Sequence, residues 1–136
     1  MAPQHPSPDL QLRARSFWLV VGWMLVVLVI YLSLTPAPVE IGLEQGDKLS
    51  HVFAYLVLMS WFANLYETPV QRLGLALGFI LLGISLEFIQ RYTGYRSFEI
   101  NDMVAGTAGV AIGWTLASPR TPNYLDLAER FWRRYQ

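Results

Sequence analysis

Hydrophobic residues gather in four long runs along the chain, with short polar segments between them. The first run, 17–34, holds no charged residue, and the segment from Thr35 to Pro38 ends it because proline lacks the amide hydrogen that a helix needs. Three further runs follow at roughly 49–66, 73–90 and 103–118. Since about 20 apolar residues cross the hydrocarbon core of a bilayer, the pattern predicts an all-α membrane protein with a four-transmembrane-helix bundle.

The fourth run is short and rich in small residues. Gly106 and Gly109 lie three positions apart, and Gly109 and Gly113 lie four apart, so one flank of this helix is almost bare backbone. Flanks of this kind let two helices approach closely in lipid. We therefore expect this helix to pack tightly against a neighbour, with tilt or local bilayer thinning accommodating its length.

The two ends of the chain differ from the runs between them. Residues 1–16 are polar and contain prolines, which predicts a disordered tail. In the segment 119–136, Thr121 and Pro122 form a helix start signal. Apolar residues then recur at helical spacing, namely Tyr124, Leu125, Ala128, Phe131, Trp132 and Tyr135, with arginines on the other side. This pattern favours an amphipathic helix on the cytoplasmic membrane surface, and a solvated tail helix is the alternative.

Charge and composition narrow the class of protein. The chain has ten basic and ten acidic residues, so it lacks the basic face that nucleic-acid binding requires, and no nucleic-acid partner is expected. It has no cysteine, which excludes disulfides, thiol catalysis and cysteine-bound zinc. A cleaved signal peptide is a competing interpretation of the first run. That run is longer than the usual apolar region of about 7–15 residues, and three more runs follow it.

The arginines and lysines predict an orientation in the membrane. The side that holds both tails and the 67–72 loop has seven of them, and the side that holds the loops near 35–49 and 91–102 has three. Because cytoplasmic loops are enriched in basic residues, we expect both termini in the cytoplasm.

Most of the remaining charged and polar residues then fall at the outer ends of the helices. They are Asp47, Lys48 and His51 in the second run, Glu87, Gln90 and Arg91 in the third, and Arg96, Glu99, Asn101 and Asp102 before the fourth. His51 and Glu87 lie about one turn inside their runs, where a charge costs roughly 2–4 kcal/mol unless it is paired or hydrated. Both are therefore candidates for function, with Lys48, Arg91 or Arg96 as partners.

Three motifs in this order resemble the VanZ-like family. They lie in DKLSHVFAYLVL (47–58) and LEFIQRYTGYRSFEINDMVAGTAGVAIG (86–113), and they cover about half of the chain. The matching positions are Asp47, Lys48, His51 and Tyr55, then Glu87 and Gln90, then Arg96, Glu99 and Asp102. Where the family often has Asn before the small-residue stretch, this chain has Ala105 and Gly106. The resemblance implies a multi-pass protein of the bacterial inner membrane, related to resistance to teicoplanin-type glycopeptides.

The first functional hypothesis is an enzyme that acts on a membrane lipid or a lipid-linked cell-wall precursor. Glu87, His51 and Asp102 are its candidate catalytic residues, because a carboxylate and an imidazole can transfer protons. The candidate binding residues are Lys48, Arg96, Asp47, Gln90 and Tyr55, in which lysine and arginine suit a phosphate group. In a disfavoured version of this hypothesis, Asp47 and Asp102 join His51 and Glu87 around a divalent metal. A lone histidine with scattered carboxylates lacks the usual ligand spacing, so we expect no cofactor and no metal.

Two alternatives stay open. The same pocket can bind a lipid head group or a partner without catalysis. The charged cluster can instead serve only to fix how the helices pack, since buried ion pairs specify structure without adding much stability. Asp102 in particular suits the N-cap of the fourth helix. Sequence does not indicate an oligomeric state.

Overall fold

A computed structural model describes residues 9–36, 46–118 and 120–135 of the chain. Every regular element in these residues is an α-helix, which confirms the all-α prediction. The helices are α1 (Asp9–Leu34), α2 (Gly46–Leu65), α3 (Pro69–Thr93), α4 (Ile100–Leu116) and α5 (Tyr124–Arg133). The first helix begins at Asp9 and not at Phe17, so the second half of the predicted disordered tail is helical. Residues 1–8 of that tail lie outside the described residues.

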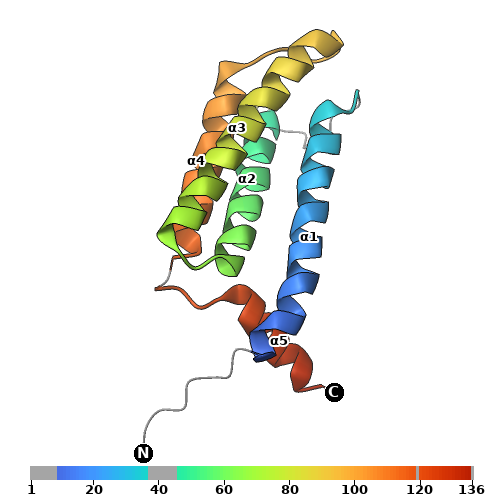
Figure 1. Ribbon diagram of the computed structural model, residues 1–136. Helices are drawn as coiled ribbons and strands as arrows, with labels where there is room; N and C mark the ends of the chain where they lie inside the picture. Colours follow the sequence, from blue (N-terminus) through green and yellow to red (C-terminus); the bar gives the residue numbers. More distant parts are fainter. Residues whose placement is uncertain (1–8, 37–45, 119, 136) are drawn as a thin grey trace, which may run out of the picture.

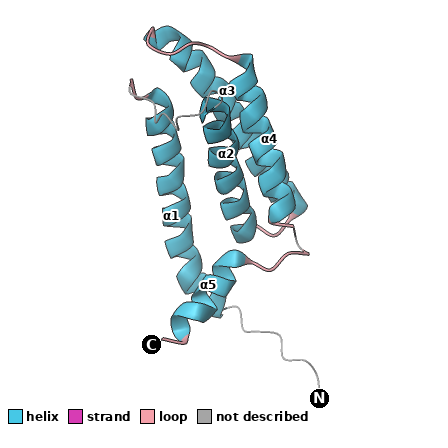
Figure 2. Ribbon diagram, turned by 180° about the vertical axis from the view of Figure 1, so that it is seen from behind, coloured by secondary structure: helices cyan, strands magenta, loops and turns pink. Residues whose placement is uncertain are grey.

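The first four helices run alternately up and down (Figure 1). α1 stands at one edge of the bundle and α4 at the other, with α2 between them, and α5 crosses the end at which α1 begins (Figures 1 and 2). This alternation brings the ends of α1 and α3 and the starts of α2 and α4 to one end of the bundle. The residues predicted to form the outer-face pocket therefore share that end.

The closest helix pair is α2 and α4, and glycines make it possible. A Cβ atom on Gly113 would lie 2.6 Å from the Leu56 carbonyl oxygen, and a Cβ atom on Gly109 would overlap the carbonyl oxygen of Val52. Any larger residue at these positions would collide with the backbone of α2. The predicted close approach along the glycine flank is confirmed.

α2 forms the centre of the bundle. Its Leu58, Met59 and Phe62 side chains are fully or almost fully buried. The Phe62 ring packs against Trp23 of α1 and Phe79 of α3, with ring centroids 5.6 and 5.5 Å apart. Aromatic contacts of this geometry stabilise packing beyond the area that they bury, so Phe62 connects three helices in one core.

Two helices in the described part of the chain are long and apolar enough to cross a membrane, over Arg15–Leu34 and Pro69–Thr93. α4 has 17 residues, fewer than the roughly 20 that a span usually needs. Signal sequences and core helices of soluble proteins can share the length and composition of a span. The four-span bundle accordingly stays a prediction.

The opposite end of the bundle is closed by Arg72. This side chain is only 8% exposed, and its guanidinium group donates to the carbonyl oxygens of Ala63, Tyr66 and Ala117 at 2.7–2.8 Å. Those carbonyls lie at the C-terminal ends of α2 and α4, where the last carbonyl groups have no hydrogen-bond partner within the helix. A cation here also offsets the negative ends of both helix dipoles. Sequence suggested only a basic loop residue at this position.

The last helix forms as predicted but starts later. Asn123, not Thr121, is its N-cap, and the Asn123 side chain accepts hydrogen bonds from the Leu125 and Asp126 amides. Asp126 pairs with Arg130 at 2.8 Å along the exposed side. α5 is held to α1 by the Trp18 indole, which donates to Glu129 at 2.9 Å. The helix therefore lies against the start of α1.

Candidate functional site

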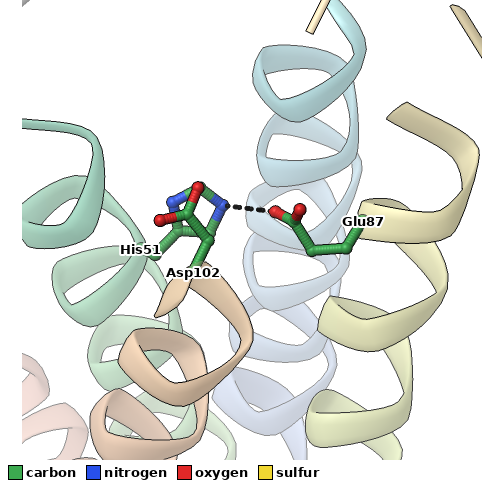
Figure 3. Close-up of side chains that lie close together, drawn as sticks. All are labelled: His51, Glu87 and Asp102. Carbon is green, nitrogen blue, oxygen red and sulfur yellow. Dashed lines mark ion pairs between the residues drawn. The ribbon is translucent and has the colours of Figure 1, made fainter. Parts of the chain in front are cut away.

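Three ionisable side chains from three helices meet at the end of the bundle opposite Arg72. His51 of α2, Glu87 of α3 and Asp102 of α4 point toward one another (Figure 3), and their ligating atoms all lie within 4.8 Å of one another. Glu87 is 2% exposed and Asp102 is 6% exposed. The sequence allowed this convergence without requiring it, and the structure shows it for these three residues.

The backbone of α2 sets the orientation of His51. The His51 Nδ1 atom lies 2.9 Å from the carbonyl oxygen of Asp47, one helical turn earlier. A carbonyl can only accept a hydrogen bond, so Nδ1 must donate to it. The other ring nitrogen, Nε2, then faces the Glu87 Oε1 atom at 3.6 Å. The main-chain carbonyl of Asp47, and not its side chain, therefore orients the His51 ring.

Glu87 sits near the end of α3 and is held from the loop that leads into α4. The Glu99 amide donates to its Oε2 atom at 3.3 Å. That bond leaves Oε1 directed toward His51. One oxygen of this buried carboxylate is therefore fixed by main chain, while the other faces the imidazole.

Asp102 does not have the capping role that its position suggested. α4 begins at Ile100 with Glu99 as its N-cap residue, so Asp102 lies in the first turn. Its side chain turns inward, and its Oδ1 atom is buried without a hydrogen-bond partner among the described residues. A buried acceptor without a donor is costly, and such atoms commonly mark a site that receives a ligand or an ion.

The basic residues do not pair with Glu87 as predicted. Lys48 pairs with Glu99 at 3.5 Å. Arg96 reaches Asp47 at 3.5 Å and the Ser33 carbonyl at 3.4 Å. The Arg91 guanidinium lies over the Phe98 ring, 5.9 Å from its centroid. Within the described ranges, the ion-pair partner of Glu87 is His51. Each of the three cations contacts an acceptor or a ring other than Glu87.

The two remaining predicted binding residues are buried in the bundle. The Gln90 amide donates to the Ser33 carbonyl at 2.7 Å and so connects α3 to the end of α1. Tyr55 is 2% exposed and packs against Gly83 of α3 and Gly106 of α4. Sequence gave no signal for Ser33, because it contributes a main-chain carbonyl that any residue carries.

A largely apolar cavity of about 570 Å³ leads to this site between α1 and α2. Its polar end has Asp47, His51 and Arg96. The rest of the lining consists of Val29, Leu32, Ser33, Leu49, Ser50, Val52, Phe53, Ala54, Tyr55 and Leu56. His51 belongs to both the cavity lining and the cluster, whereas Glu87 and Asp102 belong to the cluster but do not line the cavity.

Comparison with known proteins gives one informative similarity. The chain is 28% identical over 111 residues to the uncharacterized protein C11E3.10 of Schizosaccharomyces pombe. The match covers 79% of this chain and 66% of that protein, so it spans slightly less than two thirds of the relative's length. No family model matches the chain. No solved structure matches it either.

Proposed function

We propose that this chain is a four-span membrane protein whose outer-end pocket takes a lipid or lipid-linked molecule and acts on its head group. The cavity between α1 and α2 carries the proposal. Its volume of about 570 Å³ falls in the range of roughly 300–1,000 Å³ that is usual for small-molecule sites. One end is apolar and the other is charged, which matches a molecule with an acyl or isoprenyl chain and a polar head.

The surface of the bundle supports a lipid environment. On α1 the Trp23, Met24 and Tyr31 side chains are 59–66% exposed, and on α3 Leu77 and Leu81 are more than half exposed. Apolar surface this continuous is unfavourable in water and normal in a bilayer. α2 and α4 need less lipid-facing surface because they pack on each other. Four spans therefore fit the exposure pattern although α4 has only 17 residues.

The polar end has groups that suit an anionic head group. The contacts of Arg96 to Asp47 and to the Ser33 carbonyl are 3.5 and 3.4 Å long, beyond the range of a strong hydrogen bond. The guanidinium can exchange them for a phosphate, which it binds through two parallel N–H groups. His51 lines the same cavity, and its Nε2 atom lies 3.6 Å from Glu87 Oε1, so a proton can move to or from a bound head group.

The substrate class proposed here for the pocket is wider than the one that the resemblance to the VanZ-like family suggests. A similar protein occurs in a fission yeast, so the substrate class proposed is an anionic lipid in general. A bacterial inner membrane, cytoplasmic termini, a cell-wall precursor and glycopeptide resistance stay predictions from the resemblance to the VanZ-like family. A non-catalytic lipid binder is the second candidate, because the cavity by itself supports binding.

The test uses a phospholipid that carries a photoreactive diazirine at the end of one acyl chain. The full-length protein is placed in nanodiscs with this lipid, irradiated, and its crosslinks are mapped by mass spectrometry. We expect crosslinks to cavity residues of α1 and α2. Ala54→Trp fills the cavity and should reduce them several-fold, whereas Leu77→Trp adds the same side chain on the outer face of α3 and should not. Equal labelling of all three proteins contradicts the proposal.

Catalysis is separated from binding in a second step. Parent and Glu87→Gln are incubated with anionic lipids, and the lipids are analysed by mass spectrometry. Turnover by the parent that Glu87→Gln loses, with crosslinking retained, supports the enzyme. Crosslinking without turnover by the parent supports the lipid binder.

A further inference from the structure

The His51, Glu87 and Asp102 cluster brings together hydrogen-bond acceptors with too few donors. His51 Nδ1 donates to the Asp47 carbonyl, so Nε2 is the ring nitrogen left to face the cluster. Glu87 Oε1 faces that nitrogen at 3.6 Å, and Asp102 Oδ1 has no partner among the described residues. A single proton on Nε2 can serve Glu87 but leaves Asp102 unsatisfied. One cation bound between the three atoms would satisfy all of them at once.

We propose that these three residues bind a divalent metal ion of the Mn²⁺ or Zn²⁺ class. A dication satisfies the three acceptors together and offsets two buried carboxylates, which are otherwise costly to keep charged. Imidazole nitrogen suits zinc and iron, and carboxylate oxygen suits manganese and magnesium. One nitrogen and two oxygens favour an intermediate first-row ion over calcium. With three protein ligands, further coordination positions stay open to water or to a substrate oxygen, as in catalytic sites.

The distances are close to those that such an ion requires. Metal–ligand bonds of about 2.0–2.2 Å place neighbouring ligand atoms roughly 3–3.5 Å apart. His51 Nε2 and Glu87 Oε1 already lie 3.6 Å apart, and all of the ligating atoms lie within 4.8 Å of one another. Side-chain rotation can close the difference, because the three residues come from separate helices that face one another (Figure 3).

The surroundings of His51 also fit metal binding. Histidines that bind metals nearly always donate their other N–H to a carbonyl or carboxylate, which fixes the tautomer and turns the lone pair to the ion. The Asp47 carbonyl performs this task here. The Glu99 amide holds the second oxygen of Glu87 in the same way. The site thus has both ligands and the groups that orient them, independently of which lipid enters the cavity.

Binding is tested with the metal ions alone. The full-length protein in detergent is stripped with EDTA, and Mn²⁺ is added while free Mn²⁺ is followed by electron paramagnetic resonance. We expect one Mn²⁺ per chain, displaced by Zn²⁺. Glu87→Gln and Asp102→Asn should weaken binding by at least about tenfold. Asp126→Asn makes the same chemical change at an exposed site in α5 and should bind as the parent does.

Two further measurements do not depend on whether buried variants fold. Bound Mn²⁺ in the parent should show coupling to an imidazole nitrogen in spin-echo spectra. His5→Gln, which removes the other of the two histidines, should keep that coupling. Mn²⁺ should also raise the melting temperature of the parent by about 5 °C or more, reversibly with EDTA. Absence of Mn²⁺ and Zn²⁺ binding, absence of nitrogen coupling, or unchanged affinity in folded Glu87→Gln and Asp102→Asn overturns the proposal.

Discussion

Replacing Gly109 by alanine is the sharpest test of how α2 and α4 pack. The added Cβ atom would overlap the Val52 carbonyl oxygen and lie 3.0 Å from its carbonyl carbon and 3.1 Å from the Leu56 nitrogen. All three atoms are main chain, so no side-chain rotation relieves the contact. The helices must move apart by roughly 1 Å to restore an ordinary carbon–oxygen distance, and the neighbouring contact at Gly113 opens with them.

Two opposing effects set the change in the free energy of unfolding that Gly109→Ala causes. Adding a methyl group to a well-packed contact costs typically about 1–3 kcal/mol, and alanine favours a helix over glycine by about 1 kcal/mol. At Gly78 nothing lies within 4 Å of the added Cβ atom, so Gly78→Ala has only the favourable effect. We expect Gly109→Ala to lower the free energy of unfolding by about 1 kcal/mol, the difference between the two effects, and Gly78→Ala to leave it unchanged or raise it.

The assay is reversible unfolding in mixed detergent micelles, followed by tryptophan fluorescence. The chain has five tryptophans, and Trp23 reports on the core through its contact with Phe62. Helical content by circular dichroism before unfolding serves as the control for folding. If Gly109→Ala and Gly78→Ala both unfold at the same point as the parent, α2 and α4 do not make this close backbone contact.

Two more substitutions test the end of the bundle that Arg72 closes and α5 crosses. Arg72→Met removes the cation that serves three carbonyls and should cost about 3 kcal/mol or more of unfolding free energy; a parent-like unfolding curve would show that water replaces the guanidinium. Asn123→Ala removes the acceptor for two amides at the start of α5 and should cost about 1 kcal/mol. Faster hydrogen exchange confined to α5 is the expected readout, and unchanged exchange rejects the capping role.

The sequence by itself determined the helices and which of their ends lie together. Apolar runs, prolines and glycine spacing are local signals, and alternating helices must bring the ends carrying His51, Glu87 and Asp102 to one place. The glycine flank of α4 predicted its close packing for the same reason, since a missing side chain is visible in the sequence. The start of α1 at Asp9 was missed because the charged residues there resemble a solvated tail.

Tertiary structure alone decided which polar groups satisfy one another. Whether Asp102 caps α4 or turns inward depends on the position of the N-cap, which lies three residues earlier at Glu99. The partners of Arg72, Gln90 and Arg96 include main-chain carbonyls, and carbonyls carry no sequence signal because nearly every residue has one. The rotation of each helix about its axis then fixed the distances between His51, Glu87 and Asp102, and that rotation results from packing across the whole bundle.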